Sequence, residues 1–104
     1  MLHGEFADSV LRVLGPLGVL AAPRPPKDAG SDVAPAVAAG VPAFALQQDA
    51  SRYFDLHHTA DDTLDKVDRT QLDQNVAAWA GLAWLAADSD VNFRGPAAPE
   101  PAQP

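Results

Sequence analysis

The chain has 104 residues, a formal net charge of −7 at pH 7 and no cysteine. An acidic chain lacks the Lys and Arg patches that nucleic acid and anionic membrane surfaces require, so we expect neither as a partner. Disulfides and thiolate zinc sites are excluded because there is no cysteine. No apolar run approaches the ~20 residues of a membrane span, and no signal-peptide pattern is visible, so the compartment stays open.

The first quarter of the chain predicts a helix, a strand and a loop. Apolar residues recur at helical spacing over 4–14, and a Gly-Pro pair at 15–16 then ends the helix. The apolar run 17–22 is typical of a short buried strand. Three prolines within 23–28 remove backbone donors and favour a loop.

A short helix and a second strand are expected next. Ser31 or Asp32 can cap a helix over 33–39, and Gly40 can end it in the left-handed conformation. The run 41–46 is short, apolar and bounded by turn residues, which is the pattern of a strand covered on both faces.

The last element is a long helix. Residues 68–71 have the form of a capping box, with Asp68 as the cap and Gln71 reaching back to it. The helix is expected to run to about Ala87 and to pack through one apolar stripe, Leu72, Val76, Trp79, Ala83 and Ala86, widened by Leu82 and Leu85.

Residues 92–104 form a Pro/Ala-rich tail that we expect to be disordered. The order of elements predicts an α/β architecture with a long C-terminal helix.

The segment 53–67 holds two of the three histidines, four acidic residues and the only tyrosine. Neutral imidazole and carboxylate oxygens are ordinary ligands of divalent metals, so His57 or His58 beside Asp61 and Asp62 can be read as part of a metal site. A solvated polar loop has the same composition, and this alternative stays open on the residues alone. In open α/β sheets, ligands bind beyond the carboxyl ends of strands, which is where this loop is expected.

Three pieces of the sequence, in this order, resemble a known family. They are Gly-Ser-Asp-x-x-Pro at 30–35, the run 40–46, and Tyr-Phe-Asp-Leu-His-His-Thr-Ala-Asp-Asp-Thr-Leu-Asp-Lys-Val-Asp at 53–68. Together they resemble the end of the di-zinc exopeptidases of peptidase family M twenty-eight, the bacterial leucyl aminopeptidase and carboxypeptidase Q group. The resemblance implies that residues 1–91 are the C-terminal portion of a zinc exopeptidase domain, a partial α/β/α sandwich.

The resemblance also implies roles for individual residues. His58 matches the last zinc ligand of the family, whereas His57 is expected to pack or face solvent. Asp32 matches an aspartate near the metal centre, although its simpler role is to cap the helix that follows. Asp61 or Asp62 can hydrogen-bond the second nitrogen of the ligand ring, and Asp62 can instead cap the turn at Thr63. The general base and the other ligands of the two zinc ions are expected upstream of this chain.

The function implied is hydrolysis of a terminal peptide bond by a zinc-dependent metallopeptidase, either an aminopeptidase or a carboxypeptidase. Its partners would be a peptide substrate and the missing upstream part of the domain, and the parent protein would be one that is secreted or periplasmic. Two alternatives remain open from the sequence. The chain can be a truncated, non-catalytic fragment or binding module, or it can belong to an enzyme with glutaminyl cyclase-like acyl transfer, which uses the same last-ligand motif.

Overall fold

The computed structural model describes residues 4–22 and 30–94. The chain divides into two compact units. Unit 1 combines the residues up to Ala21 with Leu46–Ser89, and unit 2 combines Ala22–Ala45 with the residues from Asp90 onward. Unit 1 contains the two longest helices and the segment 53–67 with its two histidines, so it is the part that positions the candidate site.

Helix α1 spans Gly4–Leu14, as the spacing of its apolar residues predicts. A 3₁₀ turn, η1 (Gly15–Leu17), continues the helix for three residues with Pro16 inside it. Gly18 then adopts φ +80°, the left-handed conformation that glycine takes at least cost, and donates its N–H to the Gly15 carbonyl at 2.8 Å. The helix therefore ends where expected, but the left-handed glycine is Gly18 rather than Gly15.

Helix α4 spans Arg69–Asp88. The Asp68 carboxylate accepts a hydrogen bond from the backbone N–H of Gln71 at 2.9 Å, which confirms the predicted N-cap. Because this bond satisfies a donor that has no partner within the helix, it fixes the point at which the long helix begins.

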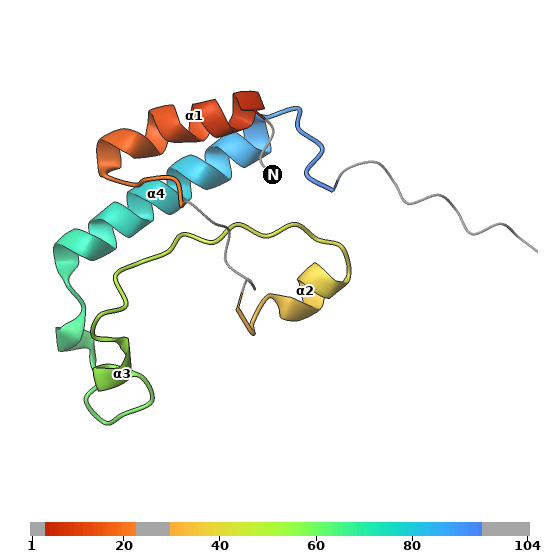
Figure 1. The fold of residues 1–104 in the computed structure, drawn as a ribbon. Helices are drawn as coiled ribbons and strands as arrows, with labels where there is room; N and C mark the ends of the chain where they lie inside the picture. Colours follow the sequence, from red (N-terminus) through yellow and green to blue (C-terminus); the bar gives the residue numbers. More distant parts are fainter. Residues whose placement is uncertain (1–3, 23–29, 95–104) are drawn as a thin grey trace, which may run out of the picture. The chain divides into compact units, whose positions relative to one another are not determined.

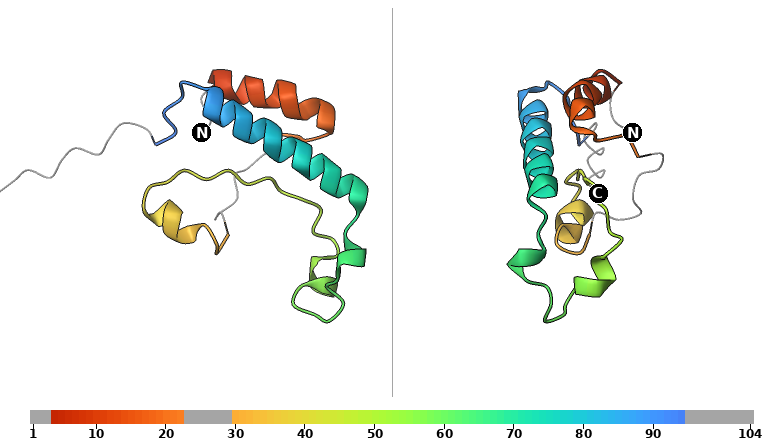
Figure 2. Two further views of the ribbon diagram at one scale, coloured as in Figure 1. Left: turned by 180° about the vertical axis from the view of Figure 1, so that it is seen from behind. Right: turned by 90° about the vertical axis from the view of Figure 1, so that its left-hand side faces the viewer.

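The core of unit 1 lies between α1 and α4, which lie side by side and run in opposite directions (Figures 1 and 2). Four side chains are buried there, Phe6, Leu14, Ala78 and Leu82. Gly81 allows the close approach, because a Cβ added to it would lie 3.1 Å from the Cγ1 atom of Val13. The Gln74 side chain adds a polar link by donating to the Leu17 carbonyl.

The apolar stripe through which α4 was predicted to pack is only partly buried. Ala78 and Leu82 face α1, whereas Leu72, Val76 and Trp79 remain 45%, 59% and 44% exposed. Helix α4 is therefore apolar on two sides, and α1 covers only one of them.

Unit 2 contains the short helix α2, Ala34–Ala38. Its end is a Schellman motif, because Gly40 (φ +82°) donates to the Val37 carbonyl and Val41 donates to the Ala36 carbonyl. The helix and its stop at Gly40 are thus confirmed. The predicted cap is wrong: Val33 occupies the N-cap position and makes no side-chain capping bond, so neither Ser31 nor Asp32 caps the helix.

The α/β/α sandwich predicted from the sequence is wrong. Neither 17–22 nor 41–46 forms a strand, and the described part of the chain, 4–22 and 30–94, contains no β-sheet. The physical reason is that a single extended segment has no ladder of hydrogen bonds, and strands of this apolar kind persist only when neighbours cover both faces. Phe44 instead packs edge-on against Phe93 within unit 2, with ring centroids 5.5 Å apart.

Two further expectations concern the ends of the described ranges. The proline-rich loop at 23–28 and most of the predicted tail lie outside the described residues. The part of the tail that is described, 92–94, forms a turn in which Arg94 donates its backbone N–H to the Asn92 side chain. None of the helices in the described ranges is long and apolar enough to cross a membrane.

Candidate functional site

The histidine pair lies in a tight turn directly after α3, a one-turn helix at Tyr53–Leu56. Thr59 donates its backbone N–H to the Leu56 carbonyl at 3.0 Å, which closes a four-residue turn with His57 and His58 at its centre. His57 has φ −54° and ψ 122°, and His58 has φ +58°. These angles are those of a type II turn, whose third position requires positive φ and favours Gly or Asn.

His58 occupies that third position, although histidine pays a steric penalty there. It is the only non-glycine residue with positive φ among those the structure describes. A left-handed conformation costs a residue with a Cβ roughly 1–2 kcal/mol. Residues held in such conformations concentrate at functional sites, so the turn itself draws attention to His58 independently of its chemistry.

Three rings stack in sequence beside this turn. The rings of Tyr53 and His57 are 4.3 Å apart and 21° from parallel, and the rings of His57 and His58 are 3.7 Å apart and 25° from parallel. The Tyr53 hydroxyl also lies 3.1 Å from Nε2 of His57. Either atom can be the donor in that bond, because the tautomer of His57 decides the direction.

The two histidines therefore differ in what their ring nitrogens can do. Nε2 of His57 is engaged by Tyr53, whereas no hydrogen bond within the described ranges reaches either ring nitrogen of His58. Both histidines are exposed to solvent. Of the pair, His58 is the one whose imidazole remains available to a ligand.

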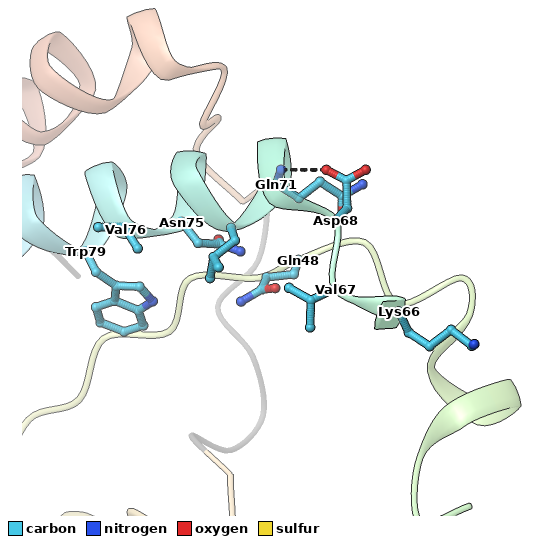
Figure 3. Close-up of a pocket in the computed structure, with 9 residues that line it drawn as sticks. Gln48, Lys66, Val67, Asp68, Gln71, Asn75, Val76 and Trp79 are labelled. Atoms are coloured by element: carbon cyan, nitrogen blue, oxygen red, sulfur yellow. Dashed lines mark hydrogen bonds between the residues drawn. The ribbon is translucent and has the colours of Figure 1, made fainter. Parts of the chain in front are cut away.

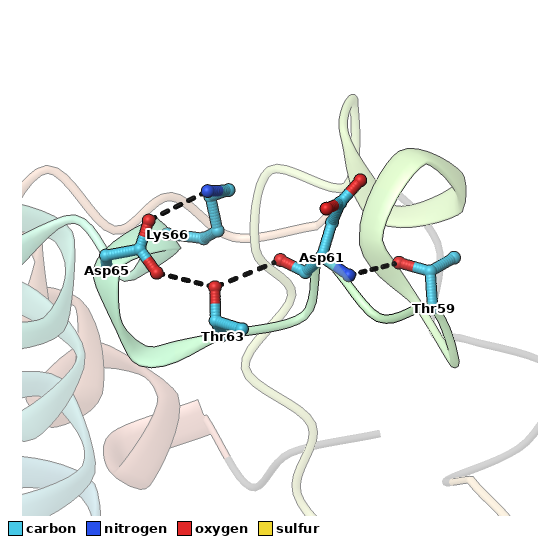
Figure 4. A network of polar contacts seen from close by, with 5 residues as sticks. All are labelled: Thr59, Asp61, Thr63, Asp65 and Lys66. Atoms are coloured by element: carbon cyan, nitrogen blue, oxygen red, sulfur yellow. Dashed lines mark hydrogen bonds and ion pairs between the residues drawn. The ribbon is translucent and has the colours of Figure 1, made fainter.

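A chain of polar contacts fixes the loop that follows (Figure 4). The Thr59 hydroxyl donates to the Leu56 carbonyl at 2.7 Å and accepts from the backbone N–H of Asp61 at 3.3 Å. Further along, the Thr63 hydroxyl lies 2.5 Å from a carboxylate oxygen of Asp65, and Lys66 lies 2.8 Å from the other oxygen. The loop is thus anchored on both sides of Asp61.

Asp65 is the titratable group that this network perturbs. The Lys66 ammonium, and then the Thr63 hydroxyl, hold the pKa of Asp65 below its ordinary value of 3.8. Both contacts favour the ionised carboxylate, so Asp65 stays charged to lower pH than an isolated aspartate. It belongs to η2, a 3₁₀ turn at Leu64–Lys66.

Asp61 and Asp62 follow the histidine turn directly in the sequence. Among the described residues, neither carboxylate accepts a hydrogen bond from the His58 ring. Thr63, not Asp62, is the N-cap of η2, and it makes no side-chain capping bond. The capping role predicted for Asp62 is therefore wrong. Orientation of the His58 ring by either carboxylate stays a prediction.

Asp32 lies elsewhere in the chain, in unit 2, within the turn that precedes α2. It is exposed. Its predicted place near the same centre as His58 stays a prediction, because the two residues belong to different units.

Two grooves border this region of unit 1. The larger, about 970 Å³, is lined by Tyr53, His57 and Asp62 together with residues from 48–52 and 65–71, and His58 is not among its lining residues. Its Asp49 side chain accepts the backbone N–H of Ser51, which lowers the pKa of that carboxyl. The smaller groove, about 610 Å³, follows the uncovered side of α4 from Val67 past Val76 to Trp79 (Figure 3).

The residues present do not build a complete zinc site. A structural zinc ion takes four protein ligands and a catalytic one about three. Within 4–22 and 30–94, no three His, Cys, Asp or Glu side chains come together in a group that could hold a metal ion. His58 can supply one bond, and any further ligands would have to come from outside the described residues.

The ring stack beside His58 was not predicted from the sequence. His57 is exposed and packs, as expected, but its partner is the Tyr53 ring, and together they form the hydrogen-bonded ring pair against which His58 lies. The signal was present in their spacing, because residues four apart share one face of a helix.

The chain is similar over a short stretch to carboxypeptidase Q of several vertebrates. The identity over 61 residues is 38% with the protein of Mus musculus, 36% with that of Rattus norvegicus and 34% with that of Homo sapiens. Each match covers 59% of this chain and 13% of the relative. No protein-family profile matches the chain, and no solved structure gives a significant match. The chain thus spans about an eighth of the length of the curated relatives that it matches, and what is established is a local similarity to carboxypeptidase Q.

Proposed function

We propose that this chain contributes His58 as one metal ligand to a zinc-dependent peptidase that hydrolyses terminal peptide bonds. The observation that carries the proposal is the local similarity to carboxypeptidase Q, a protein named for cleavage of peptides at their carboxyl end. The turn geometry supports it, because His58 is held in a costly conformation with its ring nitrogens available.

The remaining ligands and the general base are proposed to come from residues outside this chain. One imidazole cannot hold a catalytic zinc ion by itself, and the relatives are several times longer than the matched stretch. On this proposal the isolated chain binds zinc only weakly and without a defined stoichiometry.

The test is a chimera in which the matched stretch of mouse carboxypeptidase Q is replaced by the corresponding residues of this chain. We expect the folded chimera to hydrolyse a dipeptide and to lose that activity with a chelator. His58→Ala should reduce activity to the level of the chelated protein, because a lost ligand leaves the metal weakly bound.

His57→Ala is the matched control, since it removes the neighbouring imidazole from the same turn. It should reduce activity much less than His58→Ala. A folded chimera that retains activity with His58→Ala would overturn the proposal, as would one that contains zinc at the native stoichiometry yet hydrolyses nothing. Zinc content by elemental analysis and circular dichroism establish metal loading and folding separately.

A further inference from the structure

We propose that His57 is a positioning residue: its ring, held by Tyr53, sets the orientation of the His58 ring. The significance of this role rests on the proposed function, but the geometry belongs to the chain alone. Three observations carry it: the bond between Tyr53 and His57, the left-handed backbone of His58, and the stack of the two imidazoles.

The first step is the anchoring of His57 on α3. Tyr53 and His57 are four positions apart in the sequence, so their side chains leave the same face of the helical turn. The stacked rings, 4.3 Å apart, are further linked by the hydrogen bond between the tyrosine hydroxyl and Nε2. The Phe54 ring packs nearly perpendicular to the Tyr53 ring, with the centroids 5.2 Å apart. The His57 ring is thus fixed by a stack and a directional bond.

The second step is the placement of His58 on that ring. Adjacent side chains in an extended chain point to opposite sides. The positive φ of His58 reverses this, because the type II turn brings the ring of residue 58 back to within 3.7 Å of the ring of residue 57. The cost of the left-handed backbone is therefore coupled to a specific result, which is the contact between the two imidazoles.

The third step is what the contact does. An exposed histidine samples several rotamers, and immobilising a side chain on binding costs about 0.5–1.5 kcal/mol. A ring that already lies against a fixed neighbour has met part of that cost before a ligand arrives. His57 acts on binding through His58 and needs no contact of its own with the ligand.

Nuclear magnetic resonance of the 104-residue chain tests the geometry at a fixed, mildly alkaline pH. In the natural chain, the His58 ring protons should show an upfield ring-current shift, and the Hα–Hβ coupling constants of His58 should be those of a single rotamer. His57→Leu should abolish both. His57→Phe should retain the shift, because it keeps a flat ring, and Tyr53→Phe should weaken it by removing the bond to Nε2.

Phe54→Leu is the matched control, since it removes a ring of the same helical turn that packs against Tyr53. It should leave the His58 resonances unchanged. If His57→Leu leaves them unchanged too, or if Phe54→Leu shifts them as much, the positioning role is wrong.

The same variants in the chimera separate this inference from the proposed function. Loss of a residue that holds a metal-binding side chain in place typically lowers metal affinity or activity 10–100-fold. His57→Leu should therefore lower the activity of the chimera by about that factor, and His57→Phe should retain most of the activity. Full activity in His57→Leu, with His58→Ala inactive, would overturn the positioning role and leave the proposed function standing. Full activity in His58→Ala would overturn the proposed function, while the stack seen in the isolated chain would be unaffected.

Discussion

His58 is placed by a turn that its own side chain does not favour. Glycine reaches positive φ without penalty, whereas a residue with a Cβ pays roughly 1–2 kcal/mol in the left-handed region. His58 is exposed to solvent, and its ring lies against that of His57 with the centroids 3.7 Å apart. A residue other than glycine held in this conformation is an outlier of the kind that concentrates at functional sites.

Replacing His58 by glycine should accordingly make the turn more stable. The amide of Thr59, which closes the turn on the Leu56 carbonyl, should exchange with solvent roughly 5–30-fold more slowly in His58→Gly, the factor that corresponds to about 1–2 kcal/mol. Amide exchange followed by magnetic resonance measures this. His58→Ala retains the left-handed penalty and should leave the exchange rate unchanged, so equal slowing in both variants would contradict the explanation.

Asp65 makes the neighbouring turn dependent on pH. Its pKa in the folded chain is lowered, so the contacts with Lys66 and Thr63 contribute their full stabilisation above the unfolded value near 3.8. That contribution should disappear as the pH falls through the lower, folded pKa. A carboxyl titration by magnetic resonance should place the pKa of Asp65 below 3.8, and Lys66→Gln should raise it toward that value. A titration of Asp65 that is insensitive to Lys66→Gln would show that the ion pair is not the cause.

At the scale of elements, local signals were sufficient for the helices and insufficient for the strands. Helix α1 and the start of α4 follow from apolar spacing and from the Asp68 cap, both of which act within a few residues. The run 41–46 has the composition of a buried strand, but a strand needs a partner that local sequence does not specify. The candidate site divides in the same way: the sequence at 57–63 singled out His58 as a predicted ligand, whereas the ring stack beside it depends on the positive φ of His58, which the sequence does not reveal.

Gly81 sets the distance between the two long helices. An alanine Cβ there would lie 3.1 Å from Val13, and the branched Val13 side chain has one strongly preferred rotamer in a helix. Gly81→Ala should therefore fail to gain the ~1 kcal/mol that alanine normally gives over glycine in a helix.

The gain should return when Val13→Ala removes the obstructing methyl groups. A double-mutant cycle of Gly81→Ala and Val13→Ala, measured by urea unfolding at the helical dichroism band, should give a coupling of at least about 0.5 kcal/mol. Additive single and double variants would show that the helices adjust their separation without cost.

At the scale of the whole chain, the buried core is small and lies entirely in unit 1. Four side chains are buried among the described residues, and all of them come from α1 and α4. In unit 2, the described residues are exposed or half-buried. The two units therefore differ in how much apolar burial, the main stabilising contribution, supports them.

Hydrogen exchange should reveal this difference directly. We expect the strongest amide protection near the centre of α4, around Ala78 and Leu82, and little protection across 41–46, because a segment without a partner strand has no ladder hydrogen bonds. Exchange mapped by mass spectrometry measures both regions in one experiment. Strong protection of 41–46 in the monomeric chain would mean that it pairs as a strand, contrary to the fold described above.

Both tryptophans of the chain lie on α4, and neither is buried: Trp79 is 44% exposed and Trp84 is 71% exposed. Their fluorescence is therefore a poor indicator of unfolding, since both indoles already contact water in the folded chain. The same exposure makes Trp79 a built-in reporter of association, because it lines the groove along the uncovered side of the helix. A shift of the emission maximum to shorter wavelength on adding another polypeptide would show that this side of α4 has been shielded from water. The shift should be absent in Trp79→Leu.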